Sequence, residues 1–345
     1  MKVLVINKDS RLKYNLRSWS WYIIPNFLIK KLLNKRLQMA IKASECGPES
    51  NYINSRVEYY CKFENKVKLP ESAPKLADFT FRNRKVKTVY FFDTVEWNRY
   101  FDKNLKWLFV SGDAVCELNG KLYTNDQLLS IANGTETQTF DYPTIIKSRP
   151  LYIPNQNSVL LKLNKMRHFI FVNDPIPFEK KQSIVIFRGA VTGKNRRQLF
   201  IEKFMGNPLF SILDTARNSA NPKEWQGKEI SIKEHLHYRY IMALEGNDVA
   251  SNLKWVMSSN SIAVMPPPTC ESWFMEGKLI PNYHYIAIKP DYSDIEERIA
   301  YYESHIDEAK AIIEHAHEFV NQFKDKKRED VISLLVAYKY FQLTN

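Results

Sequence analysis

Residues 183–200 read SIVIFRGAVTGKNRRQLF. A hydrophobic run typical of a buried strand leads into a turn with Gly189 and Gly193, and a basic helix then begins with Lys194, Arg196 and Arg197. Free backbone N–H groups at a helix start, small residues and nearby cations suit a diphosphate. The stretch matches neither GxGxxG nor GxxxxGK(S/T), so an ordinary strand-to-helix turn with a solvated basic face is the competing interpretation.

Other strand-like runs predict a mainly parallel sheet around this turn. They read VKTVYFFD at 86–93, LKWLFVSGD at 105–113, VLLKLNK at 159–165, RHFIFVND at 167–174, SIAVM at 261–265 and YHYIAI at 283–288. Several of them end in polar turns and feed helices. In such sheets the ligands lie outside the carboxyl ends of the strands.

Helical patterns follow the first turn in three places. They are NRRQLFIEKFM at 195–205, SIKEHLHYRYIMAL at 231–244 and one long helix over 292–323, whose start we predict from a capping box of Ser293 and Glu296. His284, which leads into a strand-like run, is interpreted as a hydrogen-bonded core residue, with a catalytic base as the alternative.

A second turn has the same character as the first one. Residues 244–255 read LEGNDVASNLKW, so a polar turn around Gly246 is followed by a helix that begins near Ser251 and carries Lys254. Asn247, Asp248 and Ser251 are natural helix caps, so a capping turn competes here with a cradle for an anionic ligand.

The bulk composition indicates a folded protein with more than one core. The chain has 345 residues, of which 44% are apolar and 26% are charged, so two domains or one large α/β unit is expected. Its four cysteines are far apart in the sequence and form no CxxC pair, which argues against a disulfide framework and a zinc cluster. We find no signal-peptide core and no membrane span, so we expect a cytoplasmic protein.

A net charge of +12 requires an anionic partner, such as a nucleic acid, an anionic membrane surface or a phosphorylated substrate. Residues 1–42 contain ten basic residues and one acid, Asp9. Within this segment, WSWYIIPNFLIKKLLNKRLQMAI interleaves aromatic rings with lysines, and its leucines recur at helical spacing. It is either a helix packed on its own domain or a peripheral contact with the inner membrane.

The ordered series of motifs resembles glycosyltransferase family 90. The series comprises FRG at 187–189, the LEG to LK stretch ending at Lys254, LIPNYHYI at 279–286 and DYSD at 291–294. GD at 112–113, KSR at 147–149 and RHF at 167–169 are similar to the bacterial LpsA-like branch, which assembles lipopolysaccharide, more than to the eukaryotic protein O-glucosyltransferases. The resemblance covers roughly residues 105–320.

The resemblance implies an α/β protein of the GT-B class, with two Rossmann-like domains facing across a cleft. We expect an acceptor-binding domain at 1–172, a nucleotide-sugar-binding domain at 178–322, and a C-terminal helix at 323–345 that returns to the first domain. The implied reaction is inverting, needs no metal or other cofactor, and moves glucose or galactose from a UDP-sugar to a hydroxyl of a phosphorylated, lipid-linked glycan such as lipopolysaccharide or lipooligosaccharide.

Site residues follow from the match to the family motifs. The expected donor-binding set is Arg188, Gly189, Ala190, Arg196, Gly246, Asn247, Asp248, Val249, Ala250, Ser251, Asn252 and Lys254. Candidate donor or acceptor contacts are Lys147, Ser148, Arg149 and Glu271. The eukaryotic enzymes have an arginine where this chain has Asn252, and an asparagine cannot neutralise phosphate, so other cations must carry that charge.

Inverting transfer requires a base that takes the proton of the acceptor hydroxyl. Asp113 follows a strand-like run at the position of the family's catalytic aspartate, and Asp93 and Asp174 are its rivals. Two other classes of function stay open: a basic nucleic-acid-binding protein, although no recognised motif for one is present, and a non-catalytic glycan-binding protein on a transferase fold.

Overall fold

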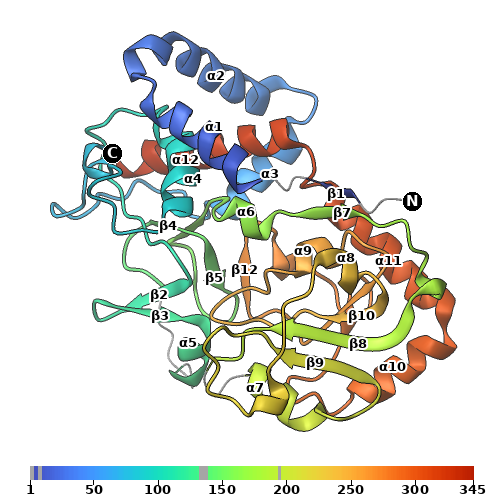
Figure 1. The fold of residues 1–345 in the computed structure, drawn as a ribbon. Coiled ribbons are helices and arrows are strands. Elements are labelled where there is room, and N and C mark those ends of the chain that lie inside the picture. Colours follow the sequence, from blue (N-terminus) through green and yellow to red (C-terminus); the bar gives the residue numbers. More distant parts are fainter. Residues whose placement is uncertain (1–3, 7–9, 132–138, 193–195) are drawn as a thin grey trace. The chain divides into compact units, whose positions relative to one another are not determined.

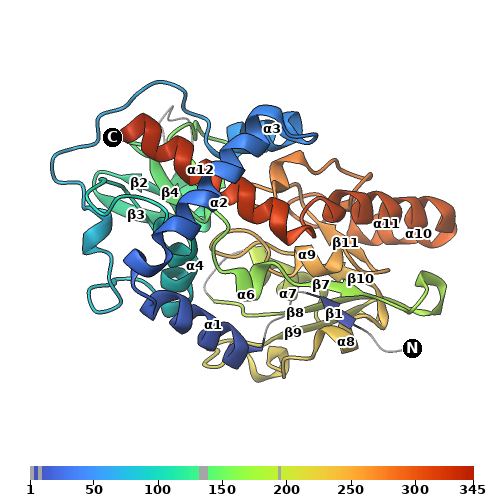
Figure 2. The same cartoon turned by 90° about the horizontal axis from the view of Figure 1, so that it is seen from above.

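The computed structural model describes residues 4–6, 10–131, 139–192 and 196–345. Figures 1 and 2 show its helices and strands from two directions. The chain divides into two compact units, each made from separate stretches of sequence. Unit 1 consists of Met1–Lys8, Arg167–Thr269 and Met275–Gln322. Unit 2 consists of Asp9–Met166, Cys270–Phe274 and Phe323–Asn345.

Unit 1 is built on a five-stranded parallel sheet (Figure 1), which confirms the predicted parallel α/β character. The strand order is β13-β11-β10-β8-β9, and every neighbouring pair is parallel. The bounds are β8 Gln182–Gly189, β9 Phe210–Asp214, β10 Tyr238–Met242, β11 Ile262–Met265 and β13 Ile286–Ala287. A separate antiparallel pair joins β1 Leu4–Ile6 to β7 Phe171–Asn173.

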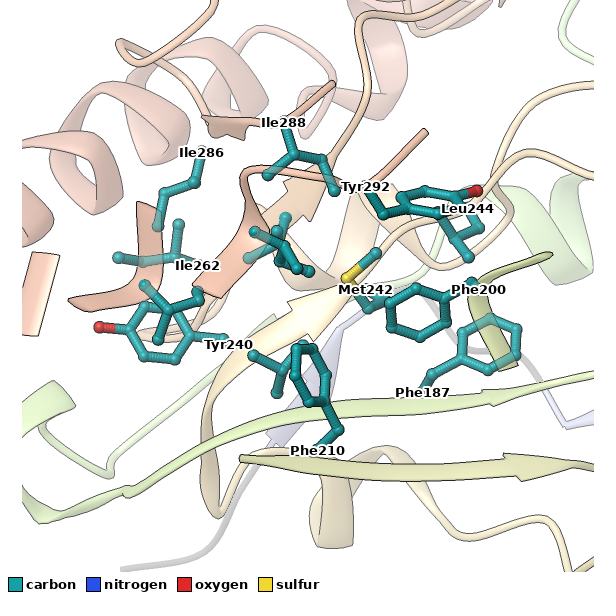
Figure 3. Packing of buried hydrophobic residues seen from close by; sticks show 14 of the residues in the cluster. Phe187, Phe200, Phe210, Tyr240, Met242, Leu244, Ile262, Ile286, Ile288 and Tyr292 are labelled. Atoms are coloured by element: carbon teal, nitrogen blue, oxygen red, sulfur yellow. The ribbon is translucent and has the colours of Figure 1, made fainter. Parts of the chain in front are cut away.

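An aromatic cluster fixes the first helix of unit 1 to its sheet (Figure 3). Phe200, from α7 Arg196–Phe204, is fully buried, and its ring centroid lies 5.8 Å from that of Phe187, 6.0 Å from that of Phe210 and 5.3 Å from that of Tyr292. The hydroxyl of Tyr292 also donates to the backbone carbonyl of Arg196. The start of α7 is therefore held at the end of β8.

The remaining helices of unit 1 differ from the prediction in one respect. The single helix predicted over 292–323 is two helices, α10 Ile295–Ser304 and α11 Ile306–Asn321, separated at His305. The predicted capping box is wrong, because Ser293 Oγ bonds to Asp291 Oδ1 and α10 begins after Asp294. The shorter elements of unit 1 are η2 Phe178–Lys180, η3 Lys223–Trp225, α8 Ile232–His235, α9 Leu253–Val256 and η4 Glu276–Lys278, and α6 Lys165–His168 starts in unit 2 and ends in unit 1.

The helix predicted over 231–244 is wrong beyond its first turn. Only α8 is helical, and residues from Tyr238 onward form β10 between β8 and β11. Tyr240, Ile241 and Met242 are all buried, since a central parallel strand is covered on both faces. Its continuous apolar run hides the alternation that would have indicated a strand.

Unit 2 combines helices with three separate pairs of strands. The helices are α1 Arg11–Ile23, α2 Asn26–Cys46, α3 Ser50–Tyr60, η1 Leu76–Asp78, α4 Thr88–Asn98, α5 Asn125–Ile131 and α12 Lys326–Thr344. The strand pairs are β2 Ala114–Leu118 with β3 Lys121–Thr124, β4 Thr144–Ile146 with β6 Ser158–Leu160, and β5 Ser148–Pro150 with β12 Cys270–Ser272. The long helix α12 packs against α2, α3 and α4.

The strand predicted at 86–93 is wrong, because this segment forms α4. Tyr90, Phe91, Phe92 and Val95 are buried on several sides of the helix, so its sequence shows no polar face. A short apolar run that is buried all around cannot be assigned to a helix or a strand by its period. Asp93, expected at the end of a strand, therefore lies inside a helix.

Residues 105–113, also predicted as a strand, make only isolated bridges, at Lys106 to Lys75 and at Phe109 to Ile145. The segment ends at Gly112, whose φ of +95° is a left-handed conformation that favours glycine. The turn at Gly112 places Asp113 directly before β2.

Candidate functional site

The first candidate site lies at the carboxyl ends of the parallel strands of unit 1. From β8 the chain proceeds to β9 on one side, and it then returns to β10 on the other side. This reversal between β8 and β10 is a topological switch point, where open parallel sheets bind their ligands. The FRG residues end β8 and the LEGND stretch follows β10, so the fold brings the two predicted turns together at this switch point.

Arg188 is directed to the neighbouring strand. Its Nη1 atom donates to the Ser211 carbonyl oxygen at 2.7 Å, and its Nη2 atom donates to Ser211 Oγ at 2.9 Å. Burial lowers the pKa of the guanidinium below its ordinary value. These contacts make Arg188 a link between β8 and β9.

Arg196 meets the loop after β10 through an acidic residue. Its Nη1 atom lies 2.6 Å from Glu245 Oε2, and the same carboxylate accepts the Thr269 backbone N–H at 3.0 Å and its hydroxyl at 2.6 Å. Arg196 and Glu245 are partly exposed, with side-chain exposures of 21% and 10%. An ion pair at this depth can exchange its partner for a charged ligand.

Arg197 joins the two turns. Its Nη1 atom donates to the Ala190 carbonyl oxygen at 2.9 Å, and its Nη2 atom donates to the Leu244 carbonyl oxygen at 2.8 Å. A Cβ atom at Gly246 would lie 3.0 Å from Nη2 and 3.1 Å from Cζ of Arg197. Glycine at 246 thus leaves the space that the guanidinium occupies.

The rest of the second turn has an exposed tip, followed by buried residues that lead into α9. The Gly246 N–H donates to the Asp248 carbonyl oxygen at 3.0 Å, and Asn247 at the tip is exposed. The side chains of Asp248, Val249 and Ala250 are buried, and Ser251 is half-buried. The turn therefore presents Asn247 and backbone groups to solvent.

Asn252 and Lys254 both make contacts inside unit 1. Asn252 Nδ2 donates to the Met242 carbonyl oxygen at 2.9 Å, which ties α9 to the end of β10. Lys254 is fully buried, and its Nζ atom forms an ion pair with Glu276. The charge of Lys254 is thereby compensated inside the fold, which leaves Arg196 and Arg197 as the basic side chains described beside both turns.

Asp214, at the end of β9, was missed by the sequence analysis. Its Oδ1 atom accepts the N–H groups of Val191 and Ala216 at 2.9 Å, and its Oδ2 atom accepts bonds from Ser219 and Asn221. Burial would raise the pKa of Asp214, but the bonds from Ser219, Ala216 and Asn221 outweigh it and hold the pKa below its ordinary value. Asp214 thus fixes the backbone just after the FRG turn.

The second candidate site is Asp113, in unit 2. Lys147 Nζ lies 2.6 Å from Asp113 Oδ1, and the lysine is 2% exposed while the aspartate is 33% exposed. A buried cation thus orients a carboxylate that solvent or a substrate can reach. Gly193 and Lys194, named with the first turn, lie outside the described residues.

The two rival aspartates are enclosed. Asp174 accepts Lys181 Nζ at 2.7 Å and the Asn260 N–H at 2.9 Å, and it is buried. Asp93 is also buried and accepts the Tyr14 hydroxyl and the Lys165 N–H. Burial raises the pKa of Asp93 to about 6, against the opposing charge of Lys165. Of the three carboxylates, Asp113 is the one partly exposed to solvent.

Ser148, Arg149 and Glu271 belong to the interior of unit 2. Arg149 is fully buried, and its Nε atom lies 2.8 Å from Glu271 Oε1. Its Nη atoms donate to the carbonyl oxygens of Tyr59 and Ser158. Arg149 is opposite Glu271, and Ser148 is opposite Ser272, in the antiparallel pair of β5 and β12. These residues therefore connect distant parts of the sequence.

Comparison with known proteins assigns the chain to a family. Glycosyl transferase family 90 matches residues 158–343, which is more than half of the chain. The chain is 37% identical over 292 residues to O-glucosyltransferase LpsA of Dichelobacter nodosus, covering 84% of this chain and 83% of that protein. The chain belongs to glycosyltransferase family 90.

Eukaryotic relatives in family 90 are more distant. Protein O-glucosyltransferase 1 of Homo sapiens and that of Rattus norvegicus are each 26% identical to this chain over 152 residues, covering 42% of this chain and 38% of the relative. The resemblance to family 90 is thereby confirmed, and the chain is a glycosyltransferase.

Neither a metal-ligand cluster nor a membrane-spanning helix occurs in the described part of this family 90 chain. Among the residues that the structure describes, no three His, Cys, Asp or Glu side chains gather where they could hold a metal ion. Within the same described ranges, no helix has the length and hydrophobicity needed to cross a membrane.

Proposed function

We propose that this chain is an inverting glycosyltransferase that moves a hexose, first of all glucose, from a UDP-sugar to a hydroxyl of a lipopolysaccharide, a lipooligosaccharide or a related surface glycan. Family membership supports transfer of a sugar, and the name of the Dichelobacter nodosus relative favours glucose over galactose. The observation that carries the proposal is the meeting of two turns at the switch point between β8 and β10, with Arg196 and Arg197 bonded to the second turn.

The donor diphosphate would bind at this switch point. Arg196 already holds an anionic group, the Glu245 carboxylate, so a phosphate can replace that carboxylate without moving the arginine far. Arg197 carries the second positive charge and keeps the turns together. In this proposal the two arginines at the start of α7 supply the charge that the uncharged Asn252 cannot.

Asp113 is the proposed general base. As the acceptor oxygen attacks the anomeric carbon, its proton passes to the Asp113 carboxylate, and the bond from that carbon to the UDP oxygen breaks with its electron pair leaving on UDP. The Lys147 ion pair would fix the direction of the carboxylate before the transfer. No metal or other cofactor takes part in this proposal.

Units 1 and 2 would then be the donor and acceptor domains of a GT-B enzyme. Unit 1 has the parallel sheet of a nucleotide-binding domain, and unit 2 carries Asp113 and most of the basic N-terminal segment. A phosphorylated lipid-linked acceptor accounts for that charge, so we propose that the enzyme works in the cytoplasm, peripherally on the inner membrane.

The test is a donor screen with the full chain. UDP-glucose, UDP-galactose and GDP-mannose are compared by release of the nucleoside diphosphate and by protection against thermal unfolding. We expect UDP and UDP-glucose to raise the melting temperature and GDP-mannose to leave it unchanged. Absence of a response to every UDP-sugar would refute the proposed donor class.

The base is tested by Asp113→Asn, which removes the proton acceptor and keeps the size of the side chain. We expect binding of UDP to persist and the rate of sugar transfer to fall by a factor on the order of 10²–10⁴. Asp141→Asn, at an exposed position of the same unit, is the matched control and should retain the wild-type rate. Full transfer by Asp113→Asn would remove Asp113 from the mechanism, and absence of transfer by the wild type despite UDP binding would favour a non-catalytic glycan-binding protein.

A further inference from the structure

Unit 2 contains a cavity of about 260 Å³ that includes none of the donor-site residues and not Asp113. Its lining comes from α1, α2, α4 and α12, together with Tyr100 and Lys165. The volume is slightly below the roughly 300–1,000 Å³ of typical small-molecule sites, so it suits a group about the size of one sugar.

The charges that line this cavity favour an anion. Four basic residues, Arg17, Arg36, Lys165 and Lys326, face two acids, Glu96 and Asp330. Glu96 is paired with both Arg17, at 3.3 Å, and Lys165. Burial would raise its pKa, but the charge of Lys165 outweighs this and lowers it.

Glu96 is held by Arg17 and Lys165, and Lys165 also interacts with Asp330. Four cations against two carboxylates still leave the lining with an excess of positive charge. Arg36 and Lys326 are both exposed, so a ligand that enters from solvent can reach them.

Aromatic residues contribute to the lining of the cavity. They are Trp21, Trp97 and Tyr100, and Trp97 is buried. The indole N–H groups of Trp21 and Trp97 are themselves inaccessible to solvent and have no hydrogen-bond partner among the described residues. What the aromatic residues contribute to the cavity is therefore ring surface, which suits the C–H surface of a sugar.

We infer that this cavity binds a phosphorylated sugar residue of the glycan acceptor. The phosphate meets Arg36 and Lys326, and the sugar ring lies against the aromatic residues. The inference rests on the proposed function for the identity of the acceptor. The binding itself can be measured without any transfer reaction.

The experiment is calorimetric titration of the full chain with glucose 6-phosphate, glucose and inorganic phosphate. Glucose 6-phosphate should bind most tightly of the three. The double substitution Arg36→Glu with Lys326→Glu should weaken its binding by about tenfold or more, which corresponds to about 1.4 kcal/mol.

The matched control is Lys35→Glu with Lys327→Glu, which changes the net charge equally on the same two helices at exposed positions outside the lining. It should leave the affinity for glucose 6-phosphate within about twofold, a difference of ~0.4 kcal/mol. Equal losses in the two double variants would mean that only the overall charge matters, and this would overturn the inference. Equal affinity for inorganic phosphate and glucose 6-phosphate would overturn it too, because the cavity would then not recognise sugar.

Protection of the wild-type chain by UDP is measured in a separate experiment. If UDP fails to bind while glucose 6-phosphate binds through Arg36 and Lys326, the proposed donor class is wrong and the inference about the cavity is supported. If UDP binds and glucose 6-phosphate does not, the cavity inference fails alone.

Discussion

Gly246 shows how the absence of a side chain can make room for another residue. The guanidinium of Arg197 occupies the space beside Gly246 and bonds to the carbonyl oxygens of both Ala190 and Leu244. The sequence motif predicts a glycine for close approach of a ligand. The structure gives a different reason, which is the close approach of an arginine from α7.

Gly246→Ala should therefore weaken binding of UDP, since a Cβ atom 3.0 Å from Nη2 would displace the guanidinium and loosen the two turns. We expect about a tenfold loss of affinity, or ~1.4 kcal/mol, measured by calorimetric titration with UDP. Asn247→Ala, at the exposed neighbouring position, should bind UDP as the wild type does. In the background of Arg197→Lys, the alanine should cost less, because contacting residues are not additive.

The side chain of His284 forms a hydrogen bond inside the fold. Its Nδ1 atom accepts the Ile280 backbone N–H at 2.9 Å, which agrees with the predicted hydrogen-bonded core residue. Burial, followed by the charge of His315, lowers the pKa of His284 below its ordinary value of 6.5. A proton on Nδ1 would also abolish the bond from Ile280.

The lowered pKa of His284 determines how the stability of the protein changes with pH. Above pH 6.5 the imidazole is neutral in both the folded and the unfolded chain, so it does not make the free energy of unfolding depend on pH there. As the pH falls below 6.5, the unfolded chain takes up the proton first, and stability is lost until the lowered folded pKa is reached. His284→Asn keeps an acceptor for Ile280 and should reduce the fall in melting temperature between pH 7 and pH 5. The exposed His237→Asn should leave it unchanged.

The burial of a helix or strand decides whether its sequence pattern predicts it correctly. The helical character of α11 was predicted, although not its separation from α10, because Ala309, Ile312, Ile313, Ala316 and Val320 form one buried face at helical spacing. α4 and β10 are buried on both sides, so neither has a polar face to reveal its period. Their assignment depends on neighbours that lie far away in the sequence.

The helices α1 and α2 present the opposite case, with apolar residues exposed to solvent. Leu12, Leu16 and Ile23 on α1 are 63–70% exposed, and Phe27 and Leu28 at the start of α2 are 77% and 65% exposed. The two helices carry eight basic residues and one acid, which suits the anionic membrane surface that we propose as a partner.

We expect the triple substitution Leu16→Ser, Ile23→Ser and Phe27→Ser to weaken binding to phosphatidylglycerol vesicles by at least about tenfold. Each fully buried apolar side chain of this size is worth roughly 1.5–3 kcal/mol, so partial insertion of three suffices. Vesicle flotation measures the effect. The exposed residues Leu122, Ile131 and Ile280 can be changed to serine as a control. Equal binding by the two triple variants would argue against α1 and α2 as the membrane contact.

For the whole molecule, the units are assembled from segments that the linear sequence does not connect. β12 pairs with β5 although their paired residues Glu271 and Arg149 are 122 positions apart, and the buried ion pair between them reinforces this link. The donor-binding residues that the motifs predict lie in two short stretches, which the structure places next to each other after β8 and β10. Motif matching could not predict that Arg149 and Glu271 form a buried ion pair inside unit 2. That ion pair depends on the pairing of β5 with β12, which no local sequence pattern indicates.

The helix α12 shows the consequence of this assembly. Glu329 is fully buried in unit 2, where it binds Arg56 at 2.9 Å and the indole N–H of Trp273, and the hydroxyl of Tyr340 accepts the Leu108 N–H. These contacts join three separate parts of the sequence into one unit. α12 is thus part of the core of unit 2.

Deletion of residues 326–345 should therefore unfold unit 2 selectively. Removing the helix uncovers the apolar faces of α2, α3 and α4 and leaves the buried Arg56 without its carboxylate, and breaking such a pair alone costs about 3–5 kcal/mol. Hydrogen exchange should show lost protection in α3 and α4 and retained protection in β8, β10 and β11 of unit 1. Lys327→Ala, on the exposed side of α12, should keep both patterns. Retained protection of α3 and α4 after the deletion would show that the helix only covers a unit that folds without it.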